Sequence, residues 1–173
     1  DLYVGTITIL QSIMQMLVLP LQGVTQGTQP IISYNYGAKN YHRVRQTFKR
    51  VLAISLGYTI AAFLLVSVFA RPLARMFTPD QALIALTAKA AAVFFGGVWA
   101  FGAQMACQAA FMALGQARVS LFLALLRKVI LLVPLAILLP LLFGGEPMAI
   151  YVAEPISDFL ASATTLTLFF SRY

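Results

Sequence analysis

Polar side chains that can bind a ligand recur at helical spacing in the first apolar stretch of this sequence. Plotted at about 100° per residue, they fall within an arc of roughly 60°. This polar stripe consists of Thr8, Gln11, Gln15, Gln22, Gln26, Gln29 and Ser33. An amide buried in hydrocarbon without a partner costs about 4 kcal/mol or more, so the stripe must face other helices or water. Amides donate and accept hydrogen bonds, and the amide residues predicted to line a cavity for a small molecule are Gln22, Gln26, Gln29, Asn35, Gln104 and Gln108.

A pair of carboxylates near the end of the chain suggests proton chemistry. Glu154 and Asp158 lie one helical turn apart, on a face shared with Ser157. Two carboxylates in a medium of low dielectric repel, which favours proton uptake by one of them and predicts a proton relay. Arg127 falls within about one helical turn of the same depth, so an ion pair is the alternative. The two interpretations remain open and can hold in different states of the protein.

Two further groups of residues have structural alternatives. Gln104 and Gln108 lie one turn apart and need protein or water partners, so they either clamp helices together, for example against the polar stripe, or contact a ligand. Gly23, Gly27 and Pro30 share the face next to the stripe, where small residues allow close packing and a hinge.

The elements that position these residues are predicted to be membrane-spanning helices. Of 173 residues, 61% are hydrophobic and only 10% are charged, and about 20 apolar residues suffice to cross a bilayer as a helix. The fold class is therefore all-α, a polytopic membrane helix bundle in a single transmembrane domain over 1–173. About five transmembrane helices are expected, at about 4–36 with a kink or break near Pro20, 48–70, 81–114, 119–143 and 148–170.

Charge predicts the topology and excludes several classes of function. The net charge of +7 is concentrated between apolar segments, so it predicts orientation rather than nucleic-acid binding, and the loops 37–50 and 114–118 are placed in the cytoplasm. With one cysteine and one histidine, no metal-site spacing exists, and no cofactor is expected. No nucleophile, base and orienting group fall together, so an enzyme is not expected. The chain opens on Asp1, which suggests a fragment or a processed piece.

The run QGVTQGTQPIISYNYGAKNYHRVR at 22–45 resembles the eighth helix of the multidrug and toxic compound extrusion family and the basic loop after it. Weaker similarity extends through FMALGQARVS (111–120), LLRKVILLVPLAILLP (125–140) and AEPISD (153–158). Members of that family have twelve helices in two lobes, and the resemblance implies that this chain corresponds to helices eight to twelve.

The resemblance implies a secondary active antiporter that exports small organic cations, driven by a proton or sodium gradient. It implies a multi-pass protein in contact with membrane lipid, in a bacterial inner membrane, and a missing amino-terminal lobe as partner. Several family members carry cation-binding acids in helices seven and ten, whereas this chain has Gln104 and Gln108 in the region of the tenth. The alternatives are a related flippase of lipid-linked substrates and a non-transporting remnant or half-transporter subunit.

Overall fold

The computed structural model describes residues 2–142 and 148–172, and the secondary structure of this part is entirely helical. The elements are α1 (Leu2–Gly37), α2 (Tyr41–Arg75), α3 (Gln81–Phe94), the 3-10 turn η1 (Phe95–Gly97), α4 (Val98–Ala113), α5 (Ala117–Leu125), the π-helical segment η2 (Leu126–Leu132), α6 (Val133–Leu142) and α7 (Met148–Arg172). The predicted all-α bundle is thus confirmed.

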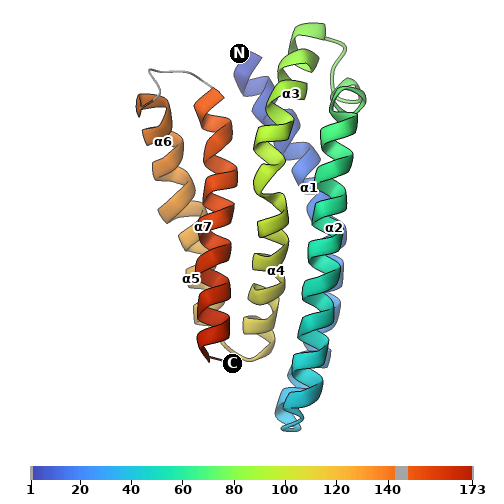
Figure 1. Cartoon of the computed structure of the whole chain (residues 1–173), viewed down its shortest axis with the longest axis vertical. Helices are drawn as coiled ribbons and strands as arrows, with labels where there is room; N and C mark the ends of the chain where they lie inside the picture. The colour runs from blue at the N-terminus through green and yellow to red at the C-terminus, as the bar shows by residue number, and fades with distance from the viewer. Residues whose placement is uncertain (1, 143–147, 173) are drawn as a thin grey trace.

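The helices run alternately up and down in one bundle (Figure 1). α1 passes behind α3 and α4 and lies along α2 at its lower end, and the α1–α2 hairpin projects beyond the turn between α4 and α5. The α5–η2–α6 rod packs on α4 and α7 at one side of the bundle. The polar stripe therefore lies on a long helix whose lower half is flanked by α2 and α4.

The first two helices are longer than the sequence predicted. α1 continues through both Pro20 and Pro30, so the alternative of a break at Pro20 is wrong. α2 begins at Tyr41 instead of about 48, which leaves only 38–40 as a loop and places most of the basic residues of 37–50 on the first turns of a helix. The turn is closed by Lys39 in the left-handed region, at φ 57°.

The third predicted helix is interrupted. Asp80 caps its start, because the Asp80 side chain accepts a hydrogen bond from Ala82 N at 2.9 Å. The helix then tightens at η1, where a Cβ on Gly97 would lie 2.6 Å from Pro155 Cα of α7. Only glycine permits this approach, so the break in the helix is a place where α7 packs closely.

The fourth predicted helix contains the π-helical segment η2, which ends at Leu132, two residues before Pro134. Proline offers no N–H to the carbonyl four residues earlier and its ring collides with that carbonyl. Widening the preceding turn relieves the collision, and such π segments are frequent at functional sites. η2 contains both Arg127 and Lys128.

Two apolar clusters hold the bundle together near its two ends. One joins α1, α2, α3 and α7 around Leu10, Val66 and Phe95, and the other joins α1, α2, α4 and α5 around Ile32 and Phe111. Burial of large apolar side chains supplies the main non-directional stabilisation in each. The helices are thereby fixed at both ends.

Among the described residues, four helical stretches are long and apolar enough to cross a membrane: Leu2–Gly37, Tyr41–Arg75, Gln81–Ala113 and Ala117–Leu142. α7, at 25 residues, is outside this group, since its acids and hydroxyls lower its hydropathy. The predicted multi-pass membrane protein is confirmed.

Candidate functional site

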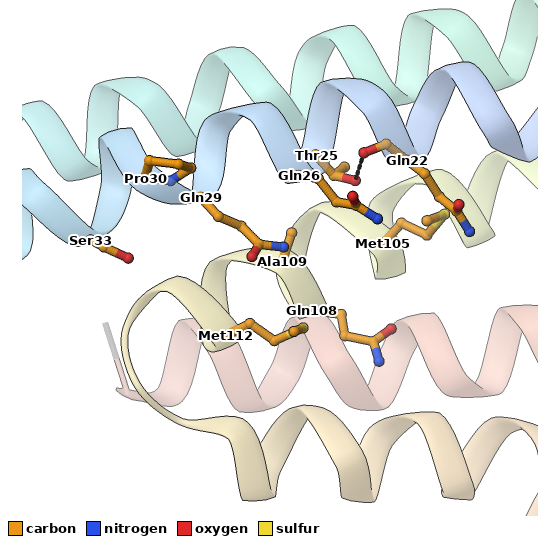
Figure 2. A pocket seen from close by; sticks show the side chains of 10 residues that line it. All are labelled: Gln22, Thr25, Gln26, Gln29, Pro30, Ser33, Met105, Gln108, Ala109 and Met112. Atoms are coloured by element: carbon orange, nitrogen blue, oxygen red, sulfur yellow. Dashed lines mark hydrogen bonds between the residues drawn. The ribbon is translucent and has the colours of Figure 1, made fainter.

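A cavity of about 600 Å³ lies between the second half of α1 and the second half of α4 (Figure 2). Its lining consists of Gln22, Thr25, Gln26, Gln29, Pro30, Ser33, Met105, Gln108, Ala109 and Met112. None of these ten residues is charged. The lining instead offers amides, hydroxyls and thioethers, which bind through dipoles and polarisable contacts.

α1 supplies the amides of the cavity through the helical spacing of its glutamines. Gln22, Gln26 and Gln29 project from α1 into the space before α4 (Figure 2). Thr25 turns its hydroxyl back onto the carbonyls of Leu21 and Gln22, at 3.0 and 3.1 Å, and therefore contributes mainly its methyl group. The glutamine amides of α1 form no hydrogen bond with the other described residues, which leaves them available to a ligand or to water.

α4 supplies a stripe of sulfur and amide groups. Met105, Gln108 and Met112 follow the spacing i, i+3 and i+7, and Ala109 leaves room between them. The Gln108 amide is held by α5, because its Nε2 donates to Ser120 O at 3.2 Å. Gln108 therefore both clamps α4 to α5 and lines the cavity. The sequence predicted the polar stripe as its partner, but its hydrogen bond goes to α5.

Two residues predicted to line the cavity lie elsewhere. Asn35 donates its amide to Ile31 O of its own helix at 2.8 Å, and it is not among the lining residues. Gln104 is 1% exposed, is also absent from the lining, and leaves its Oε1 without a hydrogen-bond partner in the part of the chain that the structure describes. Polarity alone could not separate these amides from those of the cavity. Met105 and Met112 were missed, although their helical spacing to Gln108 was visible in the sequence.

The small-residue face of α1 is open at Gly23 and Gly27 in the part of the chain that the structure describes. A Cβ placed on Gly23 or Gly27 meets no described heavy atom within 4 Å, and Pro30 is exposed beside the cavity. The predicted close packing at this face is therefore not made between the described helices.

A second polar site, separate from the cavity, joins η2 to α7. Arg127 donates from Nε to Asp158 Oδ1 at 2.5 Å and from Nη2 to Glu154 Oε1 at 3.4 Å. All three residues are buried, with 7%, 5% and 1% of Arg127, Glu154 and Asp158 exposed. The structure thus shows the ion pair that the sequence left as one of two alternatives, and it adds Glu154 to the same cluster.

Three further contacts hold Arg127 in this cluster. Its guanidinium carbon lies 4.2 Å from the centre of the Phe101 ring on α4, a distance typical of a cation–π contact. Its backbone carbonyl accepts a hydrogen bond from Ser157 Oγ of α7 at 3.0 Å. Lys128, the next residue, is exposed, so the inward cation of the adjacent pair is Arg127.

Comparisons with known proteins agree with this architecture. A family model described as MatE matches residues 1–138. The chain is similar to the MATE multidrug transporter DinF-BH, solved in complex with rhodamine 6G, with 34% identity and a TM-score of 0.86 over 99% of this chain and 38% of that one. No curated protein matches the chain.

More distant structures share the fold. An inward-facing and an outward-facing multidrug resistance MATE family transporter of the MOP superfamily both match at 17% identity and a TM-score of 0.90, over 96% and 98% of this chain and 39% and 38% of theirs. The chain thus spans less than two fifths of the length of the transporters that it matches. Because the family model covers more than half of its residues, the chain belongs to the MATE family of multidrug and toxic compound extrusion transporters.

Proposed function

We propose that this chain is the carboxy-terminal lobe of a secondary active multidrug efflux transporter and that the cavity between α1 and α4 contacts the substrate. The uncharged lining of glutamines and methionines carries the proposal. Thioethers adapt to different apolar shapes and amides supply weak hydrogen bonds, which suits a carrier that must release what it binds. Gln22, Gln26, Gln29 and Gln108 are the proposed substrate contacts.

The proposed substrates are small organic cations with delocalised charge. No carboxylate lines the cavity, so a compact cation would lose its hydration without gaining a counter-ion, whereas a flat aromatic cation can use methionine and amide contacts. The complex of DinF-BH with rhodamine 6G supports this dye as the first compound to test.

The proposed partner is an amino-terminal lobe of the same transporter. The chain spans 38% of the DinF-BH chain, and Gln15 and Gln26 of the polar stripe are exposed along α1. Exposed amides at membrane depth are costly against lipid, which supports a second lobe or a water-filled cleft opposite them. Similarity of this fold to both an inward-facing and an outward-facing transporter supports a lobe that moves as one body.

The proposed membrane is a bacterial inner membrane, with the α1–α2 hairpin and the α4–α5 turn in the cytoplasm. Lys39, Arg43, Arg45, Lys49 and Arg50 gather at the hairpin, and basic residues favour the cytoplasmic side. Modification of a cysteine introduced at Ala38 by an impermeant reagent from only one side of the membrane tests this orientation.

The test of transport is rhodamine 6G efflux by the full-length transporter in energised vesicles. The Gln26→Leu, Gln29→Leu double variant is expected to reduce efflux about tenfold or more, since two hydrogen-bonding groups of about 1 kcal/mol each are lost. Gln46→Leu, the same change at an exposed position near the start of α2, serves as the control. Collapse of the proton or the sodium gradient identifies the coupling ion. Unchanged efflux in the double variant would refute the proposed substrate contact in the cavity. Flipping of lipid-linked precursors without dye efflux would show a flippase in place of a multidrug efflux transporter.

A further inference from the structure

The buried cluster on η2 and α7 contains more negative than positive charge. It combines one guanidinium, that of Arg127, with the carboxylates of Glu154 and Asp158. With both acids ionised the three groups carry a net charge of −1, and an unbalanced charge in a medium of low dielectric is strongly unfavourable. One proton held by the two acids makes the cluster neutral.

The two carboxylates are not equivalent. Arg127 Nε approaches Asp158 at 2.5 Å, whereas its contact to Glu154 from Nη2 is 3.4 Å. A close guanidinium stabilises the ionised form of a carboxyl group. By this geometry Arg127 stabilises the negative charge on Asp158 more than on Glu154, and Glu154 is the weaker partner of the guanidinium.

The neighbouring elements offer no second buried counter-charge among their described residues. α7 packs on α3, η1, α4, η2 and α6. The charged or titratable residues of these elements are Lys89, Cys107, Arg127 and Lys128. Lys89 and Lys128 are exposed, and Cys107 is a buried thiol. On α7 itself, Tyr151 lies one turn before Glu154 and donates to Tyr3 O.

α7 is the fixed side of the cluster, so Arg127 and η2 are the parts that can move. α7 is fixed on both sides of Asp158, by the close approach of Pro155 to Gly97 and by the hydrogen bond of 2.5 Å from Ser162 Oγ to Ala100 O. Arg127, by contrast, lies in a π-helical segment, a departure from regular α-helix that is frequent at functional sites.

We propose that Glu154 is the proton-binding residue of a buried switch. While Glu154 is protonated, Arg127 pairs mainly with Asp158. Once the proton has left, Arg127 pairs with both acids. On release, the Glu154 carboxyl gives its proton to water and keeps the electron pair as a carboxylate. Arg127 then moves toward it and changes the position of η2 against α4 and α7. The proposal deepens the transport function proposed above, because the proton is then its coupling ion.

Infrared spectroscopy of the full-length transporter in lipid tests the proton directly, since a protonated carboxyl group has its own C=O stretching band. At neutral pH we expect such a band that shifts with ¹³C-glutamate, not with ¹³C-aspartate, and disappears in Glu154→Gln. The control Asp80→Asn changes an exposed carboxylate but keeps a good N-cap, and it should leave the band unchanged.

Each other outcome overturns the proposal. A band that is lost only with Asp158→Asn and shifts with ¹³C-aspartate places the proton on Asp158. A Glu154-dependent band that is absent from the wild type but appears in Lys128→Gln identifies Lys128 as the counter-charge. Failure of this proposal can be distinguished from failure of the transport proposal. The infrared band is measured without substrate, and dye efflux that depends on Gln26 and Gln29 can persist when no Glu154 band exists.

Discussion

At the scale of single residues, Arg127 connects more of the protein than any glutamine of the cavity does. Its side chain reaches two acids of α7 and the Phe101 ring of α4, and its carbonyl is bound by Ser157. A buried ion pair adds little net stability when it forms, because desolvation offsets the attraction. Removing one member is costly, however, since the partners stay buried without a counter-charge.

Arg127→Met is therefore expected to lower the free energy of unfolding by about 3 to 5 kcal/mol, the usual cost of breaking a buried pair. Thermal unfolding of the full-length protein in detergent measures it. Lys128→Met is the matched control, because it removes the exposed neighbouring cation and should change stability by less than about 1 kcal/mol. Equal effects of the two changes would contradict the assignment of Arg127 to a buried cluster.

The chemistry of the candidate site was largely visible in the sequence, but its membership was not. Helical periodicity placed Gln22, Gln26 and Gln29 on one face, and all three line the cavity. The same polarity argument included Asn35 and Gln104, which the structure places outside it. Whether an amide faces a cavity, its own backbone or a neighbouring helix depends on rotation and packing of the helices, which periodicity within one helix does not determine.

At the scale of elements, two departures from regular α-helix, η1 and η2, lie at the residues of the polar cluster. η1 lies where Pro155 approaches, directly after Glu154, and η2 contains Arg127. The sequence predicted continuous helices at both places. Gly97 and Pro134 stand at these two places. The sequence does not show that α7 approaches at Gly97, which is a matter of tertiary packing, or that the turn before Pro134 widens.

Pro134→Ala is expected to restore an N–H that can donate to Ile130 O and so to return η2 to α-helical register. Amide exchange over 126–134 should slow at least about tenfold, equivalent to about 1.4 kcal/mol and within the proline penalty of about 3 kcal/mol. Hydrogen–deuterium exchange with mass spectrometry measures this.

Pro140→Ala, a second proline of the same rod, is the control, because it lies within regular α6. Its substitution should leave exchange over 126–134 unchanged. Slowing of that segment in both variants, or in neither, would show that Pro134 is not the cause of the π-helical segment.

At the scale of the whole molecule, α1 presents polar and small residues on a side that no described helix covers. The open positions at Gly23 and Gly27 lie on this side, and the exposed Gln15 and Gln26 of the polar stripe adjoin them. A lipid-facing surface would favour large aliphatic residues, as at Leu64 and Val68 of α2. Small residues are instead typical of faces where helices pack closely, which supports the proposed contact with a second lobe.

Gly27→Leu tests that surface in the full-length transporter. Within this chain the added side chain meets nothing among the described residues, and leucine favours a helix over glycine by about 0.5 to 1 kcal/mol. If the face packs against a second lobe, overpacking instead costs about 1 to 3 kcal/mol, and the unfolding temperature falls. Gly57→Leu is the matched control, since that position on α2 is equally open and exposed, and it should raise the unfolding temperature slightly. A Gly27→Leu protein that is stabilised as much as the control would show that α1 faces lipid or water there, and the proposed lobe contact would then have to lie elsewhere.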